Sequence, residues 1–115
     1  MKSEIEELYL LSKSELEIII GNNLLLDSLG GKKASNEEKR AFGAAWISEK
    51  LSLIAENLCS SDFVIVYLKN PKKENLISAI IALSDYLVNK GTNVVPLVAA
   101  VLIVKYFIQD ICDEY

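Results

Sequence analysis

Hydrophobic side chains recur with a helical period over the middle of this chain. Between residues 36 and 59 the main apolar stripe has spacings of four, three and four residues, and it consists of Ile47, Leu51, Ile54 and Leu58. This spacing puts the four side chains on one face of a helix that we expect to run from Asn36 to Cys59. A second stripe, made of Phe42, Trp46 and Leu53, lies roughly 120° around the same helix.

The second stripe has two interpretations. It can pack against another helix inside the protein, which is what two stripes on one helix usually mean. Alternatively, Phe42, Trp46 and Leu53 form an aromatic anchor at which a partner protein binds. Gly43, followed by two alanines, would allow another helix to cross closely at this point.

Three capping boxes, in which a Ser is followed three residues later by a Glu, predict helix starts. They are Ser3 with Glu6, Ser12 with Glu15, and Ser35 with Glu38. The run Gly21-Asn22-Asn23 is typical of a helix end. The first 31 residues therefore predict two short helices and a further helical turn over residues 24–29.

Residues 62–68 are ambiguous between helix and strand. They are rich in β-branched and aromatic residues, which favour a strand. A strand needs a ladder partner, and the only mate that the chain offers is the segment 16–20. We therefore expect a short buried helix here. Asn70 and Pro71 predict the start of the next helix, with Asn70 as its cap, and that helix should run to about residue 89.

The C-terminal quarter of the chain is its most apolar part. Residues 92–104 contain no charged side chain, and a helix that is apolar on all sides lies in a protein core or in a bilayer. Because a membrane span needs about 20 apolar residues, we expect no span and place this helix, residues 94–111, in the core. Four of its side chains should be almost fully buried: Leu97, Val101, Val104 and Ile108.

The fold class that follows is all-α, a compact bundle of five to six helices around the apolar C-terminal helix. A chain of 115 residues fits a single domain, residues 1–115. Three acidic residues among the first seven do not fit a signal peptide, so we expect a cytoplasmic protein.

The composition excludes most catalytic chemistry. The chain has no histidine, and adjacent carboxylates such as Glu37 and Glu38 point about 100° apart on a helix. We therefore expect no enzyme activity, no metal and no cofactor. Cys59 and Cys112 are not part of a CxxC motif, and we interpret them as two reduced, half-buried thiols. A disulfide between them is the alternative.

Charge is distributed unevenly along the chain. The net charge of −4 consists of −4 over residues 1–31, +3 over residues 32–73 and −3 over residues 74–115. An acidic total argues against nucleic-acid binding. Basic residues gather around two helix starts: Lys32, Lys33, Lys39 and Arg40 at the first, and Lys69, Lys72 and Lys73 at the second. They either serve solubility or converge at one end of the bundle and bind an acidic surface.

The chain has five or six short helices in about 110 residues and ends in an apolar helix with Ala99-Ala100, Ile103-Val104-Lys105 and Cys112. This layout resembles the small death-like or effector-associated helical domains of bacterial conflict and defence systems. The resemblance implies an adaptor that joins sensors to effectors through contacts between helical bundles.

Three functions remain open from the sequence. The first is a non-catalytic adaptor or assembly module in bacterial defence signalling, which binds a protein partner or another copy of itself. The second is a small acidic immunity or antitoxin-type inhibitor that docks on a basic enzyme through Glu4, Glu6, Glu7, Glu15 and Glu17. The third is a membrane-active protein that releases its C-terminal helix.

Overall fold

The computed structural model describes residues 2–29, 34–89 and 95–113, and every regular element within these ranges is a helix. The seven helices are α1 (Lys2–Tyr9), α2 (Lys13–Leu29), α3 (Asn36–Cys59), α4 (Asp62–Lys69), α5 (Lys73–Asn89), α6 (Pro96–Tyr106) and α7 (Ile108–Cys112). The all-helical prediction is confirmed, as is the predicted helix over residues 62–68. The described ranges hold more helices than the five or six expected, because the last predicted helix is broken in two.

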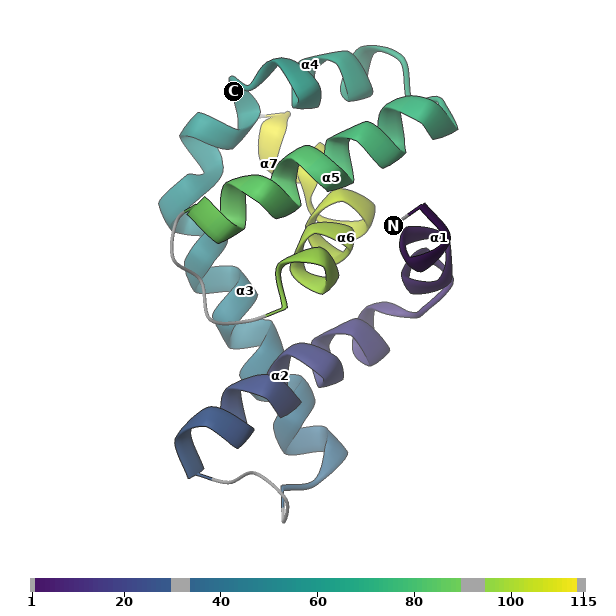
Figure 1. Cartoon of the computed structure of the whole chain (residues 1–115). Helices are drawn as coiled ribbons and strands as arrows, with labels where there is room; N and C mark the ends of the chain where they lie inside the picture. The colour runs from purple at the N-terminus through teal and green to yellow at the C-terminus, as the bar shows by residue number, and fades with distance from the viewer. Residues whose placement is uncertain (1, 30–33, 90–94, 114–115) are drawn as a thin grey trace.

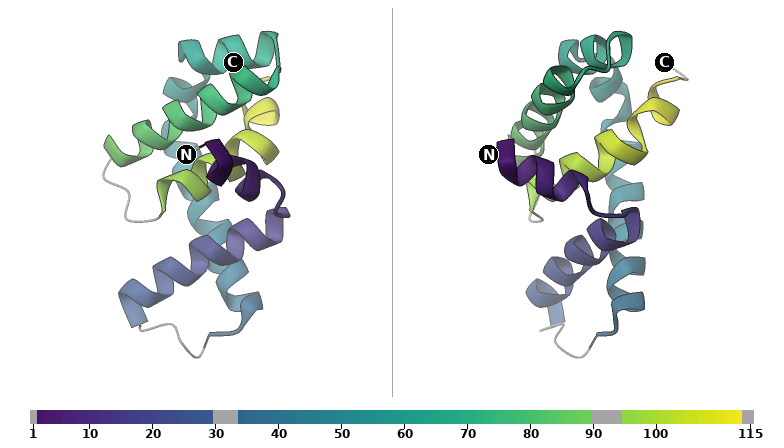
Figure 2. Two further views of the ribbon diagram at one scale, coloured as in Figure 1. Left: turned by 45° about the vertical axis from the view of Figure 1, so that its right-hand side comes forward. Right: turned by 90° about the vertical axis from the view of Figure 1, so that its right-hand side faces the viewer.

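Helix α6 lies in the middle of the upper part of the molecule, and the other helices surround it (Figures 1 and 2). It packs against α1, α2, α5 and α7. Helices α2 and α3 pack along each other, and the ends that face their connection project from the rest as a hairpin. The molecule is elongated as a result, with principal extents of 43 × 29 × 23 Å.

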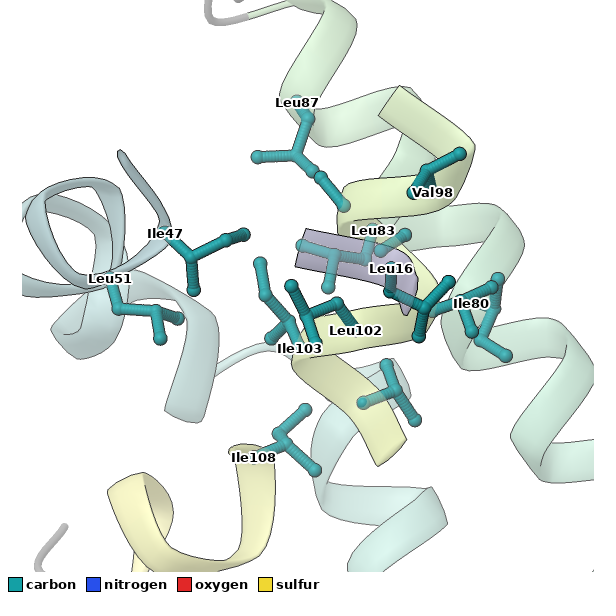
Figure 3. Packing of buried hydrophobic residues seen from close by; sticks show 14 of the residues in the cluster. Leu16, Ile47, Leu51, Ile80, Leu83, Leu87, Val98, Leu102, Ile103 and Ile108 are labelled. Atoms are coloured by element: carbon teal, nitrogen blue, oxygen red, sulfur yellow. The ribbon is translucent and has the colours of Figure 1, made fainter. Parts of the chain in front are cut away.

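The core is built around the seven consecutive residues 98–104 of α6, none of which is more than 4% exposed. Figure 3 shows Leu102 and Ile103 between side chains of α3 and α5. A helix that is apolar on every side can be accommodated only where neighbours cover all of it. The predicted burial holds for Val101, Val104 and Ile108 and is wrong for Leu97, which is only half-buried because it lines an open hollow beside α1.

The predicted continuous C-terminal helix is interrupted at Phe107. This residue has φ −123° and ψ −31°, and it separates α6 from the short α7. Its N–H still donates to the Ile103 carbonyl at 2.9 Å, and its own carbonyl accepts from Ile111 at 3.0 Å. The chain changes direction at this turn, while Ile108 immediately after it remains 1% exposed.

Helix α2 continues through Gly21, where the sequence predicted an end. A Cβ atom on Gly21 would lie 1.7 Å from the Lys39 carbonyl oxygen, and one on Gly43 would lie 2.0 Å from that of Glu17. The two glycines therefore let the backbones of α2 and α3 touch. Asn23 is accommodated because its side-chain amide donates to the Ile19 carbonyl at 2.9 Å. Close packing outweighs the modest cost of about 1 kcal/mol for glycine inside a helix.

Two of the four predicted helix caps form. Both hydrogen bonds of the capping boxes form at Ser12 with Glu15 and at Ser35 with Glu38. The box predicted at Ser3 is wrong, since α1 already begins at Lys2. Asn70 is likewise not the cap of α5. Its N–H donates to the Val66 carbonyl at 3.0 Å and so ends α4, while α5 begins three residues later.

Two cysteines that we expected to be free thiols form a disulfide. Cys59, the last residue of α3, is bonded to Cys112, the last residue of α7, with 5.3 Å between their Cα atoms. The prediction is wrong because the break at Phe107 brings α7 back to the end of α3, and nothing in the spacing of the two cysteines indicates that contact. The bond closes the fold between positions 53 residues apart.

Lys105, the one charged residue within α6, ties that helix to α1. Its ammonium group donates to the carbonyl oxygens of Tyr9 and, at 3.0 Å, of Leu11. The ring centroids of Tyr9 and Tyr106 lie 4.8 and 5.1 Å from its Nζ atom. A cation beside the last carbonyls of a helix stabilises that end. Lys105 thus has a structural role.

Candidate protein-interaction surface

The second apolar stripe of α3 is left largely uncovered by the fold. Leu53 is 69% exposed and Phe42 49%, whereas Trp46 between them is half-buried against the core. The interpretation that this stripe packs against a second helix is therefore wrong for Phe42 and Leu53. Lys50 lies beside the stripe, with its Nζ atom 5.8 Å from the centre of the Trp46 ring.

We call the exposed side of this helix the α3 face, and its residues are Phe42, Ala45, Glu49, Leu53 and Glu56. Successive members are three or four residues apart, so they form one line along the helix. Neither carboxylate of the line has an ion pair within the described residues. The α3 face is thus a mixed apolar and acidic strip.

Helix α4 has a second exposed face, which we call the α4 face: Asp62, Ile65, Val66 and Lys69. Val66 is 50% exposed and Ile65 37%, although we expected this helix to be buried. Only Val64 on the opposite side is fully buried, at 0% exposed. The sequence contains a signal for this arrangement. Asp62 and Lys69 are seven residues apart and bracket one helical face, so polar ends mark the side that points to solvent.

The two predicted groups of basic residues do not converge. Lys39 and Arg40 lie at the start of α3, near the projecting end of the α2–α3 hairpin, whereas Lys69 and Lys73 lie at the junction of α4 and α5 at the opposite end (Figures 1 and 2). Lys32 and Lys33 lie outside the described residues. The seven basic residues therefore cannot act as one site on a single copy.

The fold itself uses part of this basic charge. Arg40 donates to the Glu37 carboxylate at 2.6 Å, and its other terminal nitrogen lies 3.9 Å from Glu17. Glu17 is only 4% exposed, so Arg40 offsets the cost of a buried carboxylate. The hydrogen bond from Arg40 lowers the pKa of Glu37, and the same bond raises the pKa of Arg40.

Lys73 is also engaged, because its Nζ atom lies 3.6 Å from the carboxylate of Glu6 on α1. Lys69 and Lys72 are different. Both are exposed, and neither forms an ion pair within the described ranges. Of the predicted basic residues that the structure describes at this end, these two remain available to a partner.

Helix α1 has a shallow hollow on each side. The one towards α5 has about 290 Å³ and is lined mainly by apolar side chains of both helices, including Ile5, Tyr9 and Leu76. The one towards the start of α6 has about 420 Å³ and contains Glu4 and Glu7 at its edge. The acidic surface predicted on Glu4, Glu6, Glu7, Glu15 and Glu17 does not form as one surface, because Glu17 is buried, Glu6 is paired with Lys73 and Glu15 is bonded to Ser12.

The described residues contain no group of three or more His, Cys, Asp or Glu side chains placed to hold a metal ion. Burial raises the pKa of Tyr67, which lies beside a small polar hollow with Lys105 and Asp110. Within the same ranges no single helix has the length and apolarity to cross a bilayer; α3 and α4 reach them only as a pair bent by 83°.

Comparison of the chain with protein-family models, with curated proteins and with solved structures gives no match.

Proposed function

We propose that this protein is a non-catalytic protein–protein interaction module that acts as an adaptor or in assembly. The observation that carries the proposal is the exposure of four large apolar side chains on the outer faces of two neighbouring helices: Phe42, Leu53, Ile65 and Val66. Phe42 and Leu53 share a stripe of α3 with the half-buried Trp46, and large apolar and aromatic side chains of this kind are typical of the anchors of protein interfaces.

The energetics favour a binding role for these side chains. Fully burying a Leu or Val side chain contributes roughly 1.5–3 kcal/mol. The exposed residues of the two faces gain only part of this in folding, because 37–69% of their surface remains exposed. A partner that covers them would gain the rest of that free energy. Exposed apolar residues scattered singly need no explanation, but two on each of two helices, each pair beside unpaired charges, form a surface that a partner can recognise.

The biological setting is proposed on other grounds. The resemblance to death-like helical domains supports a role in bacterial defence signalling, and a cytoplasmic location is proposed with that role. The Cys59–Cys112 bond counts against that location, because disulfides are rare in the cytosol.

Site-specific photo-crosslinking in cells would test this function. A photoreactive phenylalanine analogue is placed at Leu53 or Val66, and at Leu10 or Val88 as matched controls that are also exposed. We expect a protein adduct from the first pair and none from the second. Absence of any adduct from Leu53 and Val66 would contradict the proposed function, whatever the identity of the partner.

A second candidate, the acidic inhibitor, is supported by the hollow between α1 and α6. Glu4 and Glu7 border it, while Leu8, Leu11, Val95 and Leu97 supply its apolar lining. A basic residue with an apolar neighbour on an enzyme surface would fit there. If the protein is an acidic inhibitor, a crosslinker at Leu11 should capture a basic protein, and Glu7→Lys should prevent this capture. The adaptor reading predicts no effect of Glu7→Lys on crosslinks from Leu53.

A further inference from the structure

We propose that the partner of the two exposed faces is a second copy of this chain, with the α4 face of one copy packed against the α3 face of the next. The inference rests on the proposed function and specifies its partner. It follows from the complementary character of the two faces: the α3 face is acidic and apolar, and the α4 face is apolar with lysines at its C-terminal end.

The carboxylates of the α3 face are opposite in charge to the lysines at the C-terminal end of the α4 face. Glu49 and Glu56 on the α3 face are both exposed and have no ion pair within the described residues. Lys69 on the α4 face and Lys72 just beyond it are also exposed, and neither has an ion pair within the described residues. Asp62, the acidic member of the α4 face, lies about 10 Å from Lys69 along the helix, in the first turn, where the helix dipole favours an acid. Complementary charges of this kind select and orient partners.

The lengths of α4 and of part of the α3 face are also compatible. Ile65 and Val66 lie in the middle of α4, which is eight residues and therefore about 12 Å long. The part of the α3 face from Glu49 to Glu56 extends over about 10 Å, so α4 fits along it and would cover Leu53. Phe42 lies about 16 Å from Leu53 along the helix and stays outside this contact.

Two other self-contacts, α3 on α3 and α4 on α4, are less favourable than the α3–α4 contact. Packing of α3 on α3 of another copy would bring the Glu49 and Glu56 carboxylates of both copies into one contact, where like charges repel. Antiparallel packing of α4 on α4 would pair Asp62 with Lys69 of the other copy. It would leave Leu53, which is 69% exposed, in water. Only the α3–α4 contact uses both faces.

A contact between different faces repeats from copy to copy. An open assembly then has an unused α4 face at one end and an unused α3 face at the other. Such heterologous contacts produce rings when the rotation closes and filaments when it does not. The assembly grows with concentration and weakens with salt, because part of the attraction is between charges.

Complementation between two variants tests this arrangement. Leu53→Asp alters only the α3 face and Val66→Asp only the α4 face, and each is measured by sedimentation velocity, alone and in an equimolar mixture. We expect the wild type to associate with rising concentration and each variant alone to associate at least about tenfold more weakly. We expect the mixture to form a one-to-one dimer, because each variant retains the face that the other lacks.

Controls separate binding from folding. Leu10→Asp and Val88→Asp alter side chains that are 84% and 56% exposed outside both faces, and they should associate like the wild type. If either face variant loses its helical circular dichroism, Leu53→Ser and Val66→Ser replace it. Association that only Leu53→Asp weakens indicates α3–α3 packing, and association that only Val66→Asp weakens indicates α4–α4 packing. Either result would overturn the proposal, as would a mixture that remains monomeric. A wild type that is monomeric at every concentration, while crosslinks from Leu53 form to another protein, overturns the second-copy partner and leaves the proposed function standing.

Discussion

Helices α6 and α4 are the two most apolar of the described helices, and the fold treats them differently. Every residue from Val98 to Val104 of α6 is buried, whereas α4 buries only Val64 completely and exposes Ile65 and Val66. Neighbours cover α6 on all sides, while α4 lies at the end of the molecule and packs on one side only (Figure 1). Apolar side chains therefore stabilise the fold in one helix and remain available for binding in the other.

The largest effect is expected when a charge is placed in the buried helix α6. Val101→Asp puts an unpaired carboxylate at a position that is 0% exposed, and the free energy of unfolding should fall by about 4 kcal/mol or more. Native domains are stable by only about 5–15 kcal/mol, so we expect partial or complete unfolding. Chemical denaturation followed by circular dichroism measures this. A stable Val101→Asp protein would show that α6 is not the core.

The disulfide ranks next in expected effect. Cys112→Ser should lower the free energy of unfolding by about 2–4 kcal/mol, because the bond restricts the unfolded chain between residues 53 positions apart. Dithiothreitol should destabilise the wild type by a similar amount and leave the Cys112→Ser variant unchanged. A wild type that is insensitive to the reductant, with two thiols that react freely with a labelling reagent, would mean that the bond does not form.

The glycine crossing between α2 and α3 should be the third most sensitive point. Gly21→Ala would improve helix propensity by about 1 kcal/mol. However, its Cβ would lie 1.7 Å from the Lys39 carbonyl oxygen, so the helices must separate. We expect a net loss of about 1–3 kcal/mol in urea denaturation. Ser48→Ala, at an exposed position of α3, is the control and should change stability by less than about 0.5 kcal/mol. A stabilising Gly21→Ala would disprove the close crossing.

Charges on the exposed faces should have a much smaller effect on folding. Leu53→Asp and Val66→Asp should each lower the free energy of unfolding by about 1 kcal/mol at concentrations where the protein is monomeric, because both side chains are partly exposed. The contrast with Val101→Asp is the test of the comparison between α6 and α4. A loss of several kcal/mol from either substitution would place its side chain in the core.

The smallest effect concerns acid. Hydrogen bonds from the Ser12 backbone and side chain lower the pKa of Glu15. A carboxylate with a lowered pKa adds stability above its unfolded-state pKa of about 4.3, and that contribution is lost as the pH falls through the folded value. Wild type should therefore exceed Glu15→Gln slightly in stability at pH 7, and the difference should shrink as the pH falls below about 4. A difference that is unchanged at pH 3 would mean that the charge of Glu15 is not involved.

The structural features that depend on local sequence pattern were predicted correctly. Helix α3, its cap at Ser35 and the buried stripe from Ile47 to Leu58 follow from periodicity and cap chemistry alone. What failed depends on contacts between distant segments. Gly21 looks like a helix end until the Lys39 backbone fills the space beside it, and Cys59 looks like a free thiol until α7 reaches it.

The candidate surface was predicted only in part, for the same reason. Phe42 and Leu53 were found as a stripe, but a stripe does not reveal whether a neighbour covers it. Ile65 and Val66 were missed, because a short apolar run is compatible with a buried helix as well as with a half-exposed one. Lys73 was grouped with Lys69, although its ion-pair partner Glu6 lies on α1, far from Lys73 in the sequence.

The account depends most on the contact between the acidic α3 face and the lysine-bearing end of the α4 face, and exchange of their charges tests it directly. Sedimentation velocity is measured for three variants. The first is the double variant Glu49→Lys/Glu56→Lys, the second is the double variant Lys69→Glu/Lys72→Glu, and the third carries all four substitutions. We predict that each pair weakens self-association, more strongly at low salt, and that the four together restore it because the attraction is then reversed in sign. A quadruple variant that associates no better than either pair would contradict the contact between these faces.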